Sequence, residues 1–429
     1  MKLLLIEPYG GRMGHFALFA THLAQELCGL GHEVLLVTGT RIQTHEFLDA
    51  APRFRLVEVG LPDGCLSARS SRMPRLLRKV LHGPTVIRIS WAAISRAIEI
   101  CAAEPFDGVY LMDWEAFSMA ALLHRYGGGG KAPLPRLVLH INPPDFSFGK
   151  HYINPPRGIY KVLARTVLRH VISRYCSGVT VQGEWHRKRI QEQFGFREAD
   201  SPRFHVVPPP TLLPETEISQ PVARRALGLD PEATVFLFFG MLRRDKGIET
   251  LLAAAAGLAG NWQLLVAGSP FDWTEAALKR AIAAMATSTR ILTDIRYIPE
   301  PEVEEYFSAA DAVVLPYTGR GHLGNFGPMI QACGYGRPLI VSDVGEMGWL
   351  VRHHGPGYAV APDDAGALRA AMDSFLHLSE EARSQMRARA RWLAVECSFT
   401  RMAEKVSDIF GDGRAAAREE RQLPQGERC

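Results

Sequence analysis

Short apolar runs alternate with amphipathic stretches along this chain, and the alternation occurs twice, once on each side of a proline-rich break. Its first instance is an apolar run at 2–7, an amphipathic stretch at 15–31 that ends in glycine, and a second apolar run at 33–38. This order predicts parallel strands, because parallel neighbours must be joined by a long crossover, usually a helix. The pattern therefore predicts an α/β protein.

The break begins with Pro208, Pro209 and Pro210 and continues to residue 222 in a segment rich in Pro, Thr and Ser. A chain of 429 residues is long enough for two domains. We therefore predict two doubly wound, Rossmann-like domains that face a cleft, with ligands at the carboxyl ends of the strands. The predicted segments are a first domain at 1–208, a linker at 209–222, a second domain at 223–395, a crossover helix at 396–411 and a disordered tail at 412–429. The later predicted strands are 108–112, 136–141, 179–182, 205–208, 234–240, 263–268, 294–298, 311–317 and 338–343.

Charge is unevenly distributed between the two halves. Residues 1–210 contain 26 Lys and Arg against 17 Asp and Glu, whereas the rest of the chain contains 23 against 28. A basic half favours an anionic partner such as a membrane surface or a phosphorylated substrate. No nucleic-acid recognition motif is present.

The cysteines and the apolar runs indicate the cellular compartment in which the protein is expected. The seven cysteines form no close pair and no metal-ligand spacing, which indicates a reduced, cytoplasmic protein with no metal site. The apolar run at the start is too short for a signal peptide, and no run is long enough to cross a membrane.

A literal G-x-G-x-x-G lies at Gly319, Gly321 and Gly324, and Asp343 follows 19 residues after the last glycine. This is the pattern of dinucleotide sites, so an NAD-dependent oxidoreductase is one hypothesis. However, such a fingerprint normally follows the first strand of its domain, and here at least three predicted strands precede it. The helix that starts near Pro328 favours an anion such as a diphosphate at its N-terminus. A simple turn with glycines for tight packing stays open.

A second motif lies at 238–254, where a predicted strand ends at Gly240 and a helix begins near Gly247. Arg243, Arg244 and Lys246 lie between them. Cations at the end of a strand that faces a cleft can neutralise a diphosphate. The alternative is that they are solvated loop charges.

Together these segments resemble the family-4 retaining glycosyltransferases, which have the GT-B fold. The Gly240–Gly247 loop is similar to the family's strand–GxLxxxKG–helix element, and 310–317 and 336–345 resemble the strands that flank its donor helix. The resemblance covers nearly the whole chain. It implies that the first domain binds the acceptor, that the second binds a nucleotide sugar with UDP or GDP, and that the last helix crosses back to the first domain. The implied donor-binding residues are Gly11, Gly240, Arg243, Lys246, Phe326, Gly327 and Gln331.

The sequence departs from the family pattern at the donor site. Met241 stands where the family has an arginine, so Arg243 is the expected substitute. The family's two glutamates correspond to Leu323 and Gln331. The Gln331 amide can hold ribose hydroxyls, whereas Leu323 cannot replace a carboxylate. We expect His322 or Asn325 to face the sugar instead.

The resemblance also implies residues near the transferred sugar in the first domain. His140 matches a histidine beside that sugar, although it can equally be a hydrogen-bonded histidine at a strand end. Asp113 and Glu115 can orient the acceptor hydroxyl or act as a base, and capping of a helix by Asp113 is an open alternative. The implied reaction is retaining hexosyl transfer that needs neither metal nor cofactor. The other hypotheses are a catalytically silent relative, and an epimerase or phosphorylase on the same fold.

Two basic amphipathic stretches predict contact with an anionic membrane surface, on the inner face of the membrane. A lipid-linked or glycan acceptor of the cell envelope would fit such a location. The alternative is two solvated helix faces. The basic residues are Arg72, Arg75 and Lys79 in the first stretch and Arg157, Lys161 and Arg165 in the second.

Overall fold

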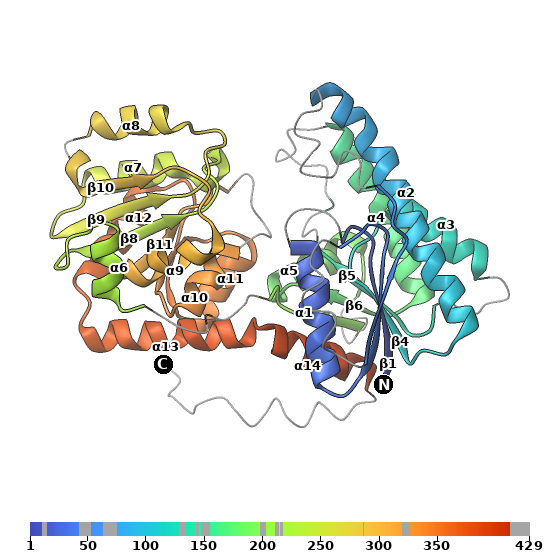
Figure 1. Cartoon of the computed structure of the whole chain (residues 1–429). Helices are drawn as coiled ribbons and strands as arrows, with labels where there is room; N and C mark the ends of the chain where they lie inside the picture. Colours follow the sequence, from blue (N-terminus) through green and yellow to red (C-terminus); the bar gives the residue numbers. More distant parts are fainter. Residues whose placement is uncertain are drawn as a thin grey trace.

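The structure is a computed structural model that describes residues 1–10, 15–42, 53–62, 75–127, 134–142, 146, 155–197, 203–210, 214, 218–285, 287–319 and 327–411. Within these residues the apolar runs form two sheets in which every strand pair is parallel (Figure 1). The predicted α/β architecture with two Rossmann-like domains is confirmed.

The first sheet has seven strands in the order β3-β2-β1-β4-β5-β6-β7. The chain therefore adds strands outward on one side of β1 and then returns to add β4 on its other side. The strands are β1 (Lys2–Glu7), β2 (Glu33–Thr38), β3 (Phe54–Glu58), β4 (Gly108–Leu111), β5 (Leu137–Ile141), β6 (Cys176–Val181) and β7 (Phe204–Val206). The helices are α1 (His15–Gly29), α2 (Arg75–Ala103), α3 (Ala116–Tyr126), α4 (Pro155–Tyr175) and α5 (Glu184–Phe194).

The second sheet repeats this order with six strands, β10-β9-β8-β11-β12-β13. The strands are β8 (Thr234–Phe239), β9 (Trp262–Ala267), β10 (Ile291–Asp294), β11 (Ala312–Leu315), β12 (Leu339–Ser342) and β13 (Gly357–Val360). The helices are α6 (Gln220–Ala226), α7 (Ile248–Ala256), α8 (Glu275–Ala283), α9 (Glu300–Ala309), α10 (Gly327–Gly334), α11 (Gly345–His354) and α12 (Ala365–Leu376), with short 3₁₀ turns at Arg244–Lys246 and Ser288–Arg290.

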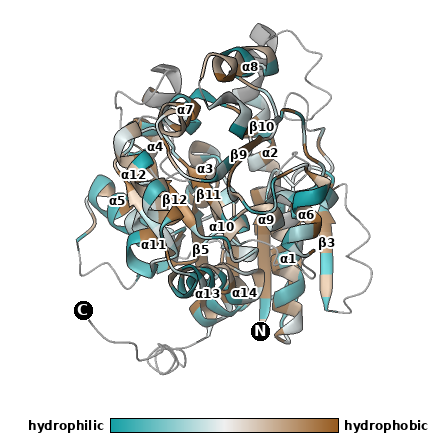
Figure 2. Ribbon diagram, turned by 90° about the vertical axis from the view of Figure 1, so that its left-hand side faces the viewer, coloured by the Kyte–Doolittle hydropathy of each residue, from teal (hydrophilic) through white to brown (hydrophobic). Residues whose placement is uncertain are grey.

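Each sheet is buried on both faces, as expected for parallel strands covered by crossover helices. In β1, Leu4 and Ile6 pack with α2, α3 and α4, whereas Leu3 and Leu5 pack with α1 and the last helix. The second sheet divides its core in the same way. Figure 2 shows the strands mostly in brown, and teal gathers on the helices that surround them.

The chain ends with α13 (Glu380–Glu396) and α14 (Phe399–Phe410), which run along one side of the molecule from the second domain to the first (Figure 1). The expected crossover is thus observed, because α13 packs on α10 whereas α14 packs on α1. The crossover helix predicted at 396–411 begins slightly later, at Phe399, because Ser398 caps α14 by accepting the Arg401 N–H at 3.2 Å.

Three strands differ from the prediction. The strand expected at 294–298 lies earlier, at β10 (Ile291–Asp294), and two edge strands, β3 and β13, were not predicted. Edge strands are only half-buried here, so their sequences lack the continuous apolar run of the central strands. None of the described helices is both long and apolar enough to cross a membrane.

Candidate active site

Sheets of this kind bind ligands in a crevice at the carboxyl ends of the two strands between which the direction of winding reverses, and in the second sheet these strands are β8 and β11. The loop after β8 is the predicted cationic element. Its Lys246 reaches across the crevice, and its Nζ lies 3.7 Å from the centroid of the Tyr317 ring, which belongs to the segment after β11. The two loops of the crevice are therefore joined by a cation–π contact.

Lys246 carries an ammonium group in a largely desolvated place. Burial, together with the nearby Arg243 charge, lowers its pKa to about 8 against the opposing effect of Asp245. A cation with such a pKa lacks sufficient negative charge around it. An anion in this crevice would restore the ordinary pKa, which makes Lys246 the strongest candidate for a diphosphate ligand among the predicted residues.

Arg243 lies in the same loop, but it is already paired. Its Nη2 is 2.6 Å from the Asp245 Oδ2, and its side chain is 40% exposed. The carbonyl oxygen of Asp245 also accepts the Thr318 N–H at 3.0 Å, which ties this loop to the segment after β11. A diphosphate bound here would share Arg243 with Asp245, a partner that the sequence analysis did not identify.

Glycines set the path of the β8 loop. Gly247 has φ +72° and an added Cβ would lie 1.8 Å from the Pro316 carbonyl oxygen. Gly268, at the end of β9, has φ +138° and an added Cβ there would lie 1.9 Å from the Gly240 oxygen. Neither position has room for a side chain, and both backbones are in the region that favours glycine. The loop is thus held against the backbones of its neighbours.

Helix α10 begins beside the same loop. An added Cβ on Gly240 would be 3.7 Å from the Pro328 Cγ, so the end of β8 faces the first turn of α10. Gly327 is the first residue of α10, and the half-buried Gln331 lies one turn further along. A helix N-terminus favours an anion through its N–H groups and its dipole. The structure therefore brings Gly240, Arg243, Lys246 and Gly327 to one crevice.

Several predicted residues lie outside the described part of the chain. They are Gly11, His322, Leu323, Asn325 and Phe326, together with Gly321 and Gly324 of the glycine fingerprint. The fingerprint follows β11, the fourth strand of its domain, whereas the dinucleotide pattern belongs after the first. The topology therefore gives no support to NAD at this loop.

His140 is buried in the first sheet. It is the last residue but one of β5, near the end of the strand that was predicted at 136–141. Its Nδ1 lies 3.0 Å from the Thr180 Oγ1 and 3.4 Å from the Tyr110 Oη. Burial lowers its pKa to about 3, so the imidazole is neutral at ordinary pH. Among the described residues none hydrogen-bonds its Nε2, which leaves that nitrogen as the one able to meet a substrate.

Asp113 follows β4, the neighbour of β1 at the point where the first sheet reverses its winding. It is half-buried, and its Oδ1 accepts the Trp114 N–H at 2.8 Å. The alternative that Asp113 caps the next helix is wrong. Glu115 is the N-cap of α3 and accepts the N–H groups of Phe117 and Ser118 at 3.1 and 2.8 Å.

Glu115 is engaged in capping α3. In addition to the two backbone donors, it accepts a hydrogen bond from the Tyr160 hydroxyl at 2.9 Å, and it is 3% exposed. A buried carboxylate with these three donors stabilises the start of α3. Asp113 thus remains the candidate of the two for a contact with the acceptor.

The predicted basic surface is described in part. Lys161 and Arg165 are half-buried on α4, and Lys161 Nζ lies 5.9 Å from the Phe146 ring centroid. Apolar side chains are exposed on the same helix, with Ile159 and Leu163 each 55% exposed. The position of Arg72 and the side chains of Arg75, Lys79 and Arg157 lie outside what the structure describes.

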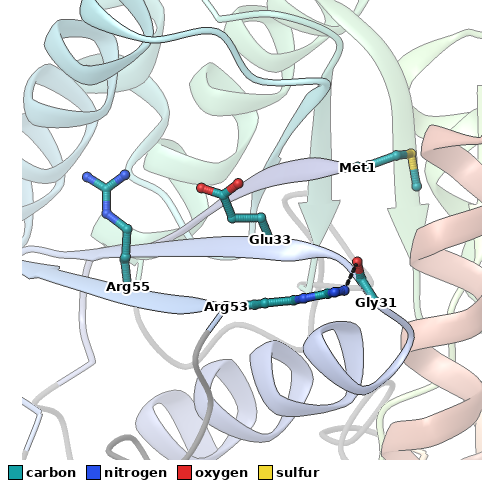
Figure 3. A pocket seen from close by; sticks show the side chains of 5 residues that line it. All are labelled: Met1, Gly31, Glu33, Arg53 and Arg55. Atoms are coloured by element: carbon teal, nitrogen blue, oxygen red, sulfur yellow. Dashed lines mark hydrogen bonds between the residues drawn. The ribbon is translucent and has the colours of Figure 1, made fainter.

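A shallow hollow lies at the opposite edge of the first sheet (Figure 3). It is lined by Met1, Gly31, Glu33, Arg53 and Arg55, and Arg53 donates a hydrogen bond to the Gly31 carbonyl at 2.7 Å. These residues lie at the amino ends of β1, β2 and β3, whereas ligands of such sheets bind at the carboxyl ends. The hollow is therefore not part of the candidate active site.

Two family models match consecutive parts of this chain. Residues 17–210 match the glycosyl transferase 4-like domain, and residues 219–392 match the glycosyl transferases group 1 model, which contains the whole Lys246 crevice. The chain belongs to the group 1 glycosyltransferase family.

The similar curated proteins match over part of their length. D-inositol 3-phosphate glycosyltransferase from Mycobacterium sp. (strain JLS) is 32% identical over 190 residues, which are 43% of this chain and 42% of that protein. The protein of the same name from Geodermatophilus obscurus is 32% identical over 214 residues, 46% and 45% of the two chains. The chain thus spans less than half the length of these two relatives.

Solved structures resemble nearly the whole of this group 1 glycosyltransferase. Sucrose-phosphate synthase from Thermosynechococcus elongatus gives a TM-score of 0.68 at 18% identity and covers 96% of this chain and 98% of that one. HepE of Anabaena, in complex with UDP-glucose, gives 0.62 at 15% identity, with 95% and 98% covered. WaaG, a glycosyltransferase of lipopolysaccharide biosynthesis, gives 0.59 at 16% identity, with 96% and 100% covered. These likenesses show that the fold is GT-B.

Proposed function

We propose that this protein transfers a hexose from a nucleoside-diphosphate sugar to a glycan or lipid-linked acceptor, with retention of anomeric configuration and without a metal ion. The observation that carries the proposal is the half-buried Lys246 ammonium after β8, which lies 3.7 Å from the Tyr317 ring centroid after β11, in a loop whose Gly240 faces Pro328 at the start of α10. A departing nucleoside diphosphate gains charge in the transition state, and fixed cations stabilise that charge.

The chemical class of the donor is inferred from this crevice. HepE of Anabaena, which shares the fold, was solved with UDP-glucose, and this supports a nucleotide sugar as donor here. In the proposal, Lys246 and Arg243 contact the diphosphate, the N-terminus of α10 faces it, and the Gln331 amide binds the ribose hydroxyls. His322 and Asn325 are proposed to face the sugar.

The reacting sugar lies between the two domains in this proposal. His140, through its Nε2, would donate a hydrogen bond to a sugar hydroxyl, because a neutral imidazole with Nδ1 accepting from a hydroxyl carries its proton on Nε2. Asp113 would hold the acceptor hydroxyl. Both residues lie at the carboxyl edge of the first sheet, which is where a substrate of this fold is expected.

The test is a transfer assay with radiolabelled UDP- and GDP-hexoses and membrane extract as acceptor source. Release of nucleoside diphosphate that depends on the extract, with an α-linked product from an α-linked donor, supports the proposal. Nucleotide binding without any transfer would instead support the catalytically silent relative. The matched control for Lys246→Ala is Lys279→Ala, because Lys279 is exposed on α8, where it pairs with Glu275.

An anionic membrane surface is proposed as a further partner, through α4. This helix contains five cations and no acid in its sequence, and Ile159, Tyr160 and Leu163 expose apolar surface on it. Cations beside exposed apolar side chains favour an anionic bilayer. Cosedimentation with phosphatidylglycerol vesicles should therefore exceed that with phosphatidylcholine. Ile159→Ser with Leu163→Ser should abolish the difference, whereas Val222→Ser, which is equally exposed on α6, should preserve it.

A further inference from the structure

Glu346 is a charged residue that is almost completely buried between the two domains. It lies in the first turn of α11 in the second domain and is 1% exposed. Its carboxylate contacts the start of α5 in the first domain, where its Oε2 accepts the His186 N–H at 3.0 Å. Figure 1 shows α5 and α11 facing one another where the two domains meet, and the two helices are in contact.

The backbone of Gly183 is shaped to receive this carboxylate. An added Cβ on Gly183 would lie 1.9 Å from the Glu346 Cδ and 2.2 to 2.3 Å from its two oxygens. Gly183 is the N-cap residue of α5 and makes no side-chain cap of its own. Helix N-termini carry N–H groups without intrahelical partners, which an acceptor must satisfy. The cap of α5 is therefore supplied by Glu346 from the other domain.

This contact lies at the same edge of both sheets as the proposed active site. Helix α5 follows β6, the neighbour of the β5 strand that holds His140. Helix α11 follows β12, the neighbour of β11, whose following segment holds Tyr317 beneath Lys246. Because the contact joins these two edges, it fixes the position of His140 relative to Lys246.

In the part of the chain that the structure describes, no cation forms a salt bridge with Glu346. Burial, together with the charge of Glu184, raises its pKa to about 7 against the backbone N–H groups of Glu184, Trp185 and His186. The thiol of Cys397, on the side of α13, is neutral because burial raises its pKa. His186 directs its Nδ1 to the Gln182 N–H at 3.2 Å. The Glu346 Oε1 is buried, and no described residue hydrogen-bonds to it.

We propose that Glu346 is a positioning residue for sugar transfer: by capping α5 it holds the two domains in the arrangement that aligns their halves of the active site, and its release opens the cleft. The role of Glu346 in sugar transfer rests on the proposed function, whereas its role in holding the two domains together does not. We call the two domains docked when Glu346 caps α5. A carboxyl group whose pKa is higher in the docked state than in the undocked state binds its proton more tightly when the domains are docked. Docking is therefore favoured at low pH and weakens about tenfold per pH unit from the ordinary glutamate value up to about 7.

The experiment compares Glu346→Ala and Gly183→Ala with the wild type and with Glu381→Ala, an exposed glutamate on α13. Small-angle scattering gives the radius of gyration, and amide hydrogen exchange reports the first turn of α5. The two test variants should be more expanded, and the amides of that turn should exchange at least tenfold faster. UDP affinity should stay within twofold. Equal scattering and equal exchange in all four proteins would overturn the proposal.

Kinetics test the positioning role separately. Both test variants should lose kcat at least tenfold while the donor KM changes less than threefold, because the donor site lies within the second domain. Glu346→Gln should recover part of kcat, since its amide oxygen can still accept the His186 N–H, and it should lose the pH dependence of docking. A kcat within twofold of wild type in Glu346→Ala would overturn the positioning role. If the wild type transfers no sugar, the proposed function fails, and scattering with exchange still decides the domain arrangement.

Discussion

The desolvated ammonium of Lys246 makes donor binding sensitive to pH at the level of a single residue. Its pKa of about 8 without ligand should rise when a diphosphate supplies negative charge. Binding then takes up a proton above pH 8, so the UDP dissociation constant should be constant below pH 7 and increase towards tenfold per unit above 8. Isothermal titration between pH 6.5 and 9.5 measures this slope.

Two variants separate the charge of Lys246 from its titration. Lys246→Arg keeps the charge at every pH and should remove the slope. Lys246→Ala loses a charge-assisted hydrogen bond worth about 1.5–3 kcal/mol and should weaken UDP binding by about 10- to 100-fold. A slope that survives in Lys246→Arg would contradict the assignment of the slope to this lysine.

His140 should act without titrating. Because burial lowers its pKa to about 3, the imidazole is neutral at ordinary pH. His140→Asn should lower kcat by about 100-fold, the usual cost of one lost hydrogen-bond donor to a transition state. The shape of the kcat–pH profile should not change. The exposed His124→Asn on α3 serves as the control, and a profile altered by His140→Asn would show that this histidine titrates.

Phe410 anchors the crossover helix α14 on the first domain. Phe410 is 2% exposed, and its ring occupies the space in which a side chain on Gly108 would lie, 2.2 Å from the added Cβ. The Arg136 guanidinium also donates to the Phe410 carbonyl at 2.8 Å. Phe410→Ala should reduce the free energy of unfolding of the first domain by about 3 kcal/mol.

Urea denaturation followed by circular dichroism measures this loss. Phe271→Ala, where the ring is 64% exposed, should change stability by less than about 0.5 kcal/mol. Equal stability of the Phe410→Ala variant and the wild type would show that α14 is not anchored on the first sheet. UDP affinity should be unaffected in either case, because the donor crevice is in the second domain.

Elements that depend on local sequence were predicted well, and contacts between distant elements were not. The loop from Gly240 to Gly247 was predicted because a strand end, a glycine and a helix start follow one another. The ion pair of Arg243 with Asp245 and the burial of Glu346 against Gly183 were not. Residues 183 and 346 meet only when both sheets are in place, and nothing in the local pattern of either segment signals the contact.

At the scale of the whole molecule, two sheets with the same strand order place their carboxyl edges towards one another. Each edge contributes part of the proposed site, His140 and Asp113 from the first and Lys246 and α10 from the second. Neither half binds both substrates in the proposal. Transfer should therefore depend on the domain contact, whereas nucleotide binding should depend on the second domain alone.

Isothermal titration of UDP, GDP, ADP and NAD into the wild type, Lys246→Ala and Lys279→Ala shows whether the Lys246 crevice binds a nucleoside diphosphate. One nucleoside diphosphate should bind, Lys246→Ala should weaken its binding at least tenfold, Lys279→Ala should change it less than twofold, and NAD should not bind. Binding of NAD alone, with equal affinity in all three proteins, would contradict this prediction.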